Sequence, residues 1–506
     1  MNTYLDQAVT GAVSPAGQSA PGEDGLVWRR VHPVTPLVKG WKALAVFAAV
    51  IVQQLGDNLA RGMNLIRDAG LPALLVLVLA VTLLATGLAV VAWRMTRYAI
   101  DAQAVHLRQG VIFRQQRQAR LDRLQAVDIV QPIVARIFGL AELKLEVAGG
   151  AGSAIKLAFL KESEANALRN ELLARAAGVV TTEGGVEAAV PPTPPERHVV
   201  AVPFSRLIGS IVLTPLVVLL VGFVIFATIA MIVAQNPGVV AALLPALLPA
   251  LFAAGSVVWT RFNQGFNFRA AVAPDGIRLR HGLTEARSQT LPPGRIQAVR
   301  LQRYVLWRWP DWWRVEVNVA GYGPKQGVTE TVLLPVGTRD EALLALWLVL
   351  PDLGVADPRA FLDAALSGSG SAHGFTTCPR RARWISPLAW WVQGVALTSR
   401  AAVLRCGRFS RQVDLIPLER TQSVGISQGP IERRFDVATL ELHSTQGSIR
   451  PRLDHLAAAD VARLAAEVVD LSRAARATAM PEQWLSRVQA AGLAVAGPAS
   501  GPGVVA

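Results

Sequence analysis

An internal repeat is the sequence feature that most constrains the fold. The segment from Arg108 to Gly149 aligns without a gap on a second segment that begins at Arg280 and on a third that begins at Arg405. Six columns are identical in all three copies: Arg108/Arg280/Arg405, Gly110/Gly282/Gly407, Arg123/Arg295/Arg420, Gln125/Gln297/Gln422, Val127/Val299/Val424 and Arg136/Arg308/Arg433. Six identities in one ungapped block exceed the coincidences expected in a chain rich in Ala, Leu, Val and Arg. The sequence therefore predicts three copies of one module, each a domain in its own right.

The composition indicates a membrane protein. Of the 506 residues, 52% are hydrophobic, the mean hydropathy is +0.36, and the formal net charge is +14. For a membrane protein, such an excess of arginine predicts cytoplasmic retention of the basic segments and attraction to an anionic inner leaflet. Nucleic acid is not expected as a partner, because no basic run is interleaved with aromatic residues that could stack on bases.

Two pairs of apolar stretches predict two transmembrane helical hairpins, at residues 37–93 and 207–260. Basic residues flank both pairs, whereas the first connecting loop has two Arg against two Asp and the second carries no charge. By the positive-inside rule, the flanks and both termini face the cytoplasm. The prediction is a multi-pass protein that displays its repeats on the cytoplasmic side.

Each repeat is predicted to be a small α+β module, the three covering residues 94–178, 261–353 and 381–476. In the first copy, alternation at 143–147 and 155–159 predicts strands, with a less regular strand pattern at 119–130. Apolar residues at helical spacing then predict closing helices at 162–177, 340–350 and 457–474.

The remaining segments are predicted to be tails and linkers. Residues 1–27 and 477–506 are expected to be disordered tails, 179–200 a proline-rich linker and 354–380 a flexible linker. The third repeat has no apolar hairpin before it. Its segment 385–397 is apolar but too short to cross a bilayer, so it either lies at the membrane surface or, as we favour, is the first strand of the module.

The repeated motifs resemble a known family. Arg-Leu-Gln-Ala-Val at 123–127, Phe-Gly-Leu-Ala-Glu-Leu at 138–143 and Val-Ala-Gly-Gly at 147–150, with the related sequences at 295–299 and 420–424, are similar to the bacterial pleckstrin-homology-like membrane proteins of the YdbS/YdbT type. The resemblance implies modules built as a bent antiparallel sheet, nearly a barrel, closed by a carboxy-terminal helix. It also implies a bacterial cytoplasmic membrane location and, loosely, a role in envelope stress.

The identical columns divide into structural and functional candidates. Most of the Arg-x-Gln-x-Val signature is interpreted as structural, with the Gln satisfying backbone groups at a bulge or barrel end, and Gly110, Gly282 and Gly407 as turn residues with positive φ. Candidates for contact with a partner or with anionic lipid are Arg136, Arg308, Arg433, Arg108, Arg280 and Arg405, for which a solvated face or an ion pair is the alternative. Trp307, Trp309, Trp312 and Trp313 allow an exposed partner-binding patch, although filling of a core or of the membrane interface is favoured.

Catalytic chemistry has little support in the sequence. No histidines lie at metal-ligand spacing, no serine lies in a nucleophile elbow, and no glycine-rich phosphate loop is found. The two cysteines, Cys378 and Cys406, exclude a disulfide framework and fit a reducing compartment. We expect no enzyme activity, cofactor or metal.

The function predicted from the sequence is a membrane-tethered scaffold for protein interactions. Its expected partners are the anionic inner leaflet and either a small sister protein with the same module or a second copy of this chain. The alternative is a lipid-handling or transport component, in which the four-helix bundle carries the activity and the modules regulate it. A polar cavity between the helices would favour that alternative.

Overall fold

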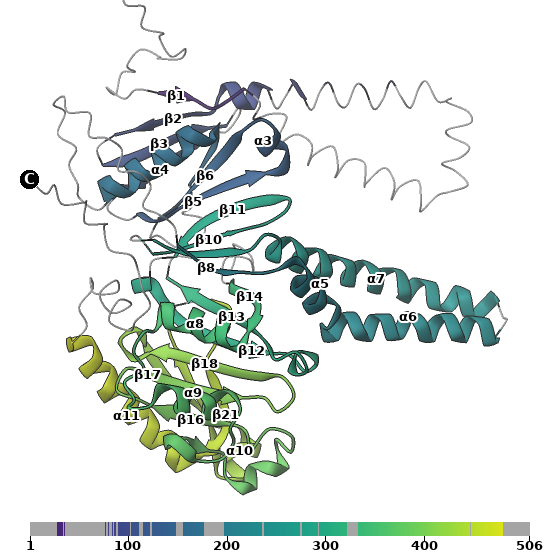
Figure 1. Ribbon diagram of the computed structural model, residues 1–506, viewed down its shortest axis with the longest axis vertical. Coiled ribbons are helices and arrows are strands. Elements are labelled where there is room, and N and C mark those ends of the chain that lie inside the picture. The colour runs from purple at the N-terminus through teal and green to yellow at the C-terminus, as the bar shows by residue number, and fades with distance from the viewer. Residues whose placement is uncertain are drawn as a thin grey trace, which may run out of the picture. The chain divides into compact units, whose positions relative to one another are not determined.

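The computed structural model describes two compact units of the chain, one ending at Glu183 and the other beginning at Gly184 (Figure 1). The described residues are 28–33, 35, 76, 79, 83, 86–87, 90–101, 103–110, 115–121, 124–147, 155–176, 197–234, 237–273, 276–291, 293–320, 332–445 and 447–478. Most of the predicted first hairpin and of the linker at 179–200 lies outside these residues, as do the tail at 1–27 and nearly all of 477–506. Each unit is described by itself.

The first unit contains the first repeat, built as two antiparallel sheets and a closing helix. The strands of the first sheet pair in chain order: β1 (Arg29–Arg30), β2 (Arg97–Ile100), β3 (Ala104–Gln109) and β4 (Gln115–Arg120). The second sheet and the helices are β5 (Leu124–Pro132), α3 (Ile133–Ile137), β6 (Leu140–Val147), β7 (Ile155–Lys161) and α4 (Glu162–Ala176). Alternate residues of these strands, with Leu168 and Leu172 of α4, form one apolar core.

The second repeat has the same order of elements. Its first sheet contains β8 (Arg197–Ala201), β9 (Arg269–Ala273), β10 (Gly276–His281) and β11 (Glu285–Leu291). Its second part contains η2 (Pro293–Arg295), β12 (Ile296–Arg303), η3 (Leu306–Arg308), β13 (Trp312–Val319), β14 (Val332–Thr338) and α8 (Arg339–Val349). Thr338 and Glu341 form a capping box that fixes the start of α8.

The third repeat follows the same plan. Its first sheet contains β15 (Thr376–Thr377), β16 (Gly394–Leu397), β17 (Ala401–Cys406) and β18 (Arg411–Pro417). The rest consists of η8 (Leu418–Arg420), β19 (Ser423–Ser427), α10 (Pro430–Arg434), β20 (Val437–His443), β21 (Arg452–Ala457) and α11 (Ala458–Thr478). The three closing helices begin and end within a few residues of the ranges predicted from apolar spacing.

The second and third repeats share one sheet. Strand β12 of the second repeat pairs antiparallel with β18 of the third, from Val299 opposite Leu415 to Arg303 opposite Arg411. The result is a seven-stranded sheet in the order β14-β13-β12-β18-β17-β16-β15. Because each repeat supplies an edge strand to the other, neither edge is left open there.

Each repeat begins earlier than the sequence predicted. Strands β1, β8 and β15 precede the predicted starts of the modules, and each pairs with the strand that follows the intervening insertion. The insertions are residues 31–96, 202–268 and 378–393. The apolar hairpins are therefore insertions between the first two strands of a module, rather than segments that precede it.

Two further predictions about the third repeat need correction. The predicted flexible linker at 354–380 contains a helix, α9 (Pro358–Leu366), which Asp357 caps through a hydrogen bond from Ala360 N to its Oδ1 at 3.0 Å. The favoured interpretation of 385–397 as a strand holds only for β16. Residues 380–384 form a 3₁₀ helix, η7, and turns follow as far as residue 393.

The second insertion forms three helices. They are α5 (Phe204–Val212), α6 (Pro215–Ala234) and α7 (Pro237–Gly265), with α6 and α7 side by side (Figure 1). In the described part of the chain, no single helix meets the length and hydropathy of a membrane span. Helix α5 and residues 215–230 of α6 meet both together, with a bend of 58° at the break before Pro215.

Candidate interaction surface

The turn glycines have the conformation that the sequence predicted. Gly110, Gly282 and Gly407 have φ angles of 112°, 109° and 80°. A Cβ at Gly282 would lie 2.0 Å from the carbonyl oxygen of Glu285, and one at Gly407 would lie 1.9 Å from that of Ser410. Only glycine fits such a turn, so the third strand of each repeat (β3, β10 and β17) ends in the same way.

The arginines that precede these turns occupy equivalent strand positions but different environments. Arg108 is half-buried, with its guanidinium carbon 4.1 Å from the ring centroid of Trp28. Arg280 is exposed on β10. Arg405 has none of its surface exposed. Equivalence in the repeat therefore does not give these three residues one role.

Arg405 is a buried structural residue. Its Nε donates to the carbonyl oxygen of Val392 at 3.1 Å, its Nη1 donates to that of Ala364 at 2.8 Å, and its Nη2 donates to that of Gly370. The guanidinium also lies 4.1 Å from the ring centroid of Phe375. Burial lowers the pKa of Arg405 to about 10, which still leaves it charged at neutral pH. The expectation that Arg405 contacts a lipid or a partner is therefore corrected.

Two local features explain this burial. Gly394 lies opposite Arg405 in the strand pair, where the second repeat has Arg269 opposite Arg280. The absence of a side chain at Gly394 leaves space for the guanidinium. Helix α9 then packs on β17 and β18, and Arg405 and Arg411 bind its last carbonyl groups.

The glutamine of the signature lies at a β-bulge in the first two repeats. The pairing of β12 with β13 shifts register between Ile296 and Ala298, around Gln297, and β5 shifts in the same way around Gln125. Gln297 is buried, and its Nε2 donates to the carbonyl oxygen of Arg295 at 3.3 Å. Gln422 is instead exposed before β19. The structural interpretation therefore fits the second repeat in detail.

The other signature residues are mostly structural as well. Val127 and Val299 are buried and Val424 packs against the core of the third repeat. Arg420 lies in η8 with its Nε 3.4 Å from Oε1 of Glu419. Arg123 lies outside the described residues.

The segment between the fifth and sixth strands is an exposed helical turn in every repeat. We call these segments the connectors: residues 133–139, 304–311 and 428–436. Each ends at an equivalent residue with positive φ, namely Gly139, Asp311 and Asp436. The connectors carry the identical arginine column of the three repeats, Arg136, Arg308 and Arg433, and all three side chains are exposed.

Large apolar side chains lie beside these arginines. Ile137 is 78% exposed, Trp309 82% and Ile431 64%. Apolar surface combined with arginine is typical of the centre of protein interfaces. Each connector therefore presents an apolar and basic surface suited to a partner.

The connector of the second repeat also holds the base of the helical insertion. Trp307 donates from Nε1 to the carbonyl oxygen of Ser210 in α5 at 3.1 Å. Arg261 of α7 donates to Oγ1 of Thr214 at 3.1 Å and to the hydroxyl of Tyr304 at 3.3 Å. Arg206 of α5 pairs with Glu341 at the start of α8. These contacts fix the insertion to its own module.

The four clustered tryptophans have separate roles. Trp307 and Trp313 are fully buried, in agreement with the interpretation as core residues. Trp312 packs on Gly209 of α5, where a Cβ would come within 2.8 Å of its ring. Only Trp309 of the four projects into solvent.

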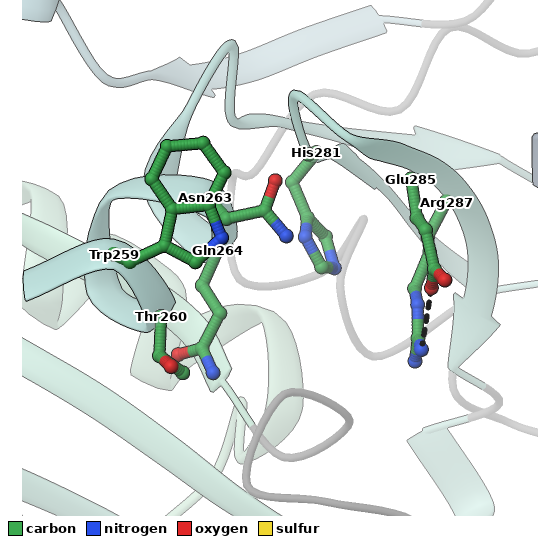
Figure 2. Close-up of a pocket in the computed structure, with 8 residues that line it drawn as sticks. Trp259, Thr260, Asn263, Gln264, His281, Glu285 and Arg287 are labelled. Atoms are coloured by element: carbon green, nitrogen blue, oxygen red, sulfur yellow. Dashed lines mark hydrogen bonds and ion pairs between the residues drawn. The ribbon is translucent and has the colours of Figure 1, made fainter. Parts of the chain in front are cut away.

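A small polar pocket lies where α7 meets the turn between β10 and β11. Its volume is about 120 Å³, and Figure 2 shows Trp259, Thr260, Asn263 and Gln264 on the helix side and His281, Glu285 and Arg287 on the strand side. Glu285 and Arg287 form an ion pair at 3.3 Å.

Asn263 joins the two sides of this pocket. Its Oδ1 accepts hydrogen bonds from the backbone N–H groups of Leu283 and Thr284 at 3.0 and 2.8 Å. Burial, with the nearby Arg287 charge, lowers the pKa of His281 to about 4, so its imidazole is neutral at physiological pH. The pocket therefore contains one cation that is already paired, which gives little means of binding an anion.

An ion pair between repeats was missed by reasoning from sequence. Nε and Nη2 of Arg300 on β12 donate to the two carboxylate oxygens of Asp414 on β18 at 2.7 and 2.9 Å. Burial raises the pKa of Asp414, and Arg300 opposes that rise. Burial lowers the pKa of Arg300, but the hydrogen bond and charge of Asp414 act in the opposite direction, so the pKa of Arg300 is raised overall. The sequence signal that could have indicated this ion pair is that its column differs among the repeats, because Arg300 aligns with Asp128 and Gly425.

A second contact joins these repeats. Asn318 of β13 donates from Nδ2 to the carbonyl oxygen of Ile449 at 2.7 Å and accepts from Ile449 N at 3.0 Å. The second and third repeats are thus bound by a sheet, an ion pair and a buried amide. Across the residues that the structure describes, no group of three His, Cys, Asp or Glu side chains could hold a metal ion.

The comparisons with known proteins agree with the repeated fold. A family model described as Bacterial PH domain matches the chain three times, at residues 47–176, 207–346 and 364–475. No curated protein and no solved structure matches the chain.

Proposed function

We propose, from the premise that this chain belongs to the bacterial PH domain family, that it is a non-enzymatic scaffold tethered to the cytoplasmic membrane. In this proposal the helical insertions anchor the chain, and the PH-like modules bind another protein on the cytoplasmic side. The observation that carries the proposal is the presence of an exposed apolar and basic connector on every module.

The surface of α6 supports the tether. Its residues 215–230 and α5 together have the length and hydropathy of a bent membrane span. Leu219, Phe226 and Ile232 are among many large apolar side chains of α6 that are exposed. A continuous apolar surface of this length needs a cover, and lipid is the cover proposed.

The charge of the chain supports the orientation. The whole chain has a net charge of +14, which suits attraction to the anionic inner leaflet, and the basic flanks favour cytoplasmic termini. The proposed protein partner is a small membrane protein with the same module, or a second copy of this chain. The sharing of one sheet by the second and third repeats is a precedent for association between such modules.

The alternative of a lipid-handling or transport component has weaker support. The pocket of Figure 2 is lined by α7 and by β10 and β11, so it lies at the base of the helices and not between α6 and α7. A pathway for a polar solute would need polar groups within the helical insertion itself.

Cross-linking in intact cells tests the scaffold. The full-length chain would be captured with its partners, and the proteins identified and quantified by mass spectrometry, for the natural sequence and for Arg136→Ala/Arg308→Ala/Arg433→Ala. We expect a stoichiometric protein partner whose recovery falls at least about tenfold in the variant, because central arginines each contribute more than about 1 kcal/mol to such interfaces.

The matched control is Arg359→Ala/Arg463→Ala/Arg473→Ala. It removes the same charge from exposed positions on α9 and α11, and it should retain the partner. Equal loss in both variants would indicate a general charge effect and would contradict a role for the connectors. Release of the chain from membranes by alkaline carbonate would contradict the tether.

A further inference from the structure

The third repeat retains a counterpart of the membrane insertions. Each module is interrupted between its first two strands, and in the first two repeats this interruption contains the predicted apolar hairpin. In the third repeat the same position, between β15 and β16, contains only residues 378–393. This short insertion lies where the other modules are proposed to enter the bilayer.

The repeat alignment extends into this insertion. At the offset that superimposes Arg280 on Arg405, Trp384 aligns with Trp259 of α7, and Trp391 aligns with Phe266. Trp259 is half exposed near the carboxyl end of α7, beside the β10–β11 turn. The short insertion thus keeps the aromatic residues of the membrane-proximal end of the hairpin while losing the hairpin itself.

The insertion has one face in the core and one in solvent. Ala382 is buried, Ile385 and Trp390 pack against the core of the third repeat, and Ser386 bonds through Oγ to Nδ1 of His455 at 2.8 Å. Other side chains of the insertion are exposed: Trp384 is 70% exposed, Leu388 56% and Trp391 36%. A rigid support therefore presents large apolar side chains outward.

The turn between β17 and β18 extends the same surface. Arg408 lies with its guanidinium carbon 4.5 Å from the ring centroid of Trp391 and 5.4 Å from that of Phe409. Arg383 lies 5.0 Å from the ring centroid of Trp384. Phe409 is itself half exposed. The surface alternates aromatic rings and guanidinium groups, as do protein segments that lie at the level of lipid headgroups.

The charge around this surface is of one sign. Between Asp363 and Asp414 the chain has no Asp or Glu and has seven arginines. Arg405 and Arg411 are buried, Arg381 pairs with Asp436 at 2.6 Å and Arg400 with Asp352 at 3.6 Å. Arg380, Arg383 and Arg408 remain exposed, and among the described residues none of them pairs with a carboxylate.

We propose that Trp384, Leu388, Trp391, Arg383, Arg408 and Phe409 form an interfacial anchor that binds an anionic bilayer surface. The aromatic and leucine side chains enter the headgroup region, and the arginines bind lipid phosphates. The anchor would hold the third repeat on the membrane that the helical insertion enters, and to that extent it rests on the proposed tether.

A depth measurement on the full-length chain tests the anchor. A spin label would be placed at Leu388→Cys, with a second label at Arg473→Cys on the exposed face of α11 as the reference. The native thiols should not compete, because burial raises the pKa of both Cys378 and Cys406 to about 12. The chain would be reconstituted in phosphatidylglycerol-containing and in pure phosphatidylcholine vesicles.

We expect the label at residue 388 to be more accessible to oxygen and less accessible to a water-soluble nickel reagent than the reference label, in anionic vesicles only. Arg383→Glu/Arg408→Glu should give the label at residue 388 the accessibilities of the reference label, whereas the control Arg463→Glu/Arg473→Glu should leave the accessibilities at residue 388 unchanged. The control reverses the same charge at exposed positions on α11 that are not part of the proposed anchor.

Vesicle flotation separates this proposal from the tether. If the chain floats but the label at residue 388 is as accessible to the nickel reagent as the reference label, the anchor is overturned and the tether stands. A chain that does not float would overturn both. A label equally shielded in detergent and in vesicles would reveal a protein contact at this surface, and would also overturn the anchor.

Discussion

In this protein, the burial of a side chain depends on the residues packed around it rather than on its column in the repeat alignment. Arg280 and Arg405 share a column, yet one is exposed and the other is fully buried. The difference depends on Gly394 opposite Arg405 and on α9 above it. A buried guanidinium is stable only when its donors are satisfied, and three backbone carbonyl oxygens satisfy those of Arg405.

Arg405→Ala should therefore destabilise the third repeat. The substitution removes the side-chain donor from the buried carbonyl group of Val392 and from those of Ala364 and Gly370, and it opens a cavity, which should lower the free energy of unfolding by about 3 kcal/mol. Chemical denaturation of the purified chain in detergent would measure the change. Arg280→Ala, in the same column but exposed, should change the stability by less than about 1 kcal/mol. Similar effects of the two substitutions would contradict the structural role of Arg405.

His281 should make stability depend on pH. Its folded-state pKa of about 4 lies below the ordinary value of 6.5, so the unfolded chain takes up a proton at a higher pH than the folded chain. The stabilisation is complete above pH 6.5 and is lost as the pH falls from 6.5 toward 4, by about 3 kcal/mol in all.

Denaturation midpoints of the natural sequence and of His281→Gln, measured from pH 7.5 to 4, would check this expectation. The variant lacks the titrating imidazole, so its stability should fall less steeply over this range. Parallel curves for the two proteins would show that His281 does not titrate as the buried environment requires.

At the scale of elements, the β12–β18 pair joins two modules. Its ion pair between Arg300 and Asp414 is buried and bidentate. Arg300→Ala leaves a buried carboxylate without its partner, which should lower the free energy of unfolding by about 3–5 kcal/mol. Arg300→Met/Asp414→Leu replaces both charges with apolar groups and should restore most of the loss.

Denaturant titration of the single and double variants would measure this coupling. The exposed pair Arg463–Asp460 on α11, with its charges 3.3 Å apart, provides a control whose loss should cost less than about 1 kcal/mol. A double variant no more stable than Arg300→Ala would contradict the assignment of the loss to the unpaired Asp414.

The elements that the sequence predicted correctly are those whose apolar residues recur at a regular spacing. Helices α4, α8 and α11 follow the spacing of their apolar residues, and strands β6 and β7 follow alternation. Strands β1 and β15 have two residues each, which is too few to show a period. Their partners also lie beyond a long or irregular insertion, so only the folded chain reveals the pairing.

The candidate surface could be predicted only in part. The arginine columns of Arg136, Arg308 and Arg433 identified the connectors, because identical residues in equivalent positions were visible in one sequence. Which apolar residues face solvent was not visible. Trp307 and Trp309 lie two residues apart, and their opposite burial depends on the packing of α5 against the first of them.

At the scale of the molecule, the helical insertion of the second repeat is held rigidly to its module. Gly209 of α5 lies against Trp312, and Gly209→Leu should displace the helix because even a Cβ would lie 2.8 Å from the ring. We expect faster amide exchange in α5 and in residues 304–313. Gly222→Leu, on α6 with open space around it, is the matched control and should leave exchange unchanged.

Hydrogen exchange measured by mass spectrometry on the reconstituted chain would follow both variants. Equal exchange in Gly209→Leu and in the natural sequence would show that α5 is not held by this contact. Faster exchange throughout the second repeat would indicate unfolding of the module instead of release of the helix.

The shared sheet also has a consequence for synthesis. Strand β12 is complete at Arg303, but its partner β18 begins only at Arg411, 108 residues later. At about 5–20 residues per second, the ribosome needs about 5–20 s to supply that partner. During this interval a nascent second repeat exposes an open strand edge that could pair with the same edge of another nascent chain. Chains made from one messenger RNA would be especially exposed to such mispairing. The open edge of β12 is covered only when the third repeat has been synthesised and β18 has paired with it.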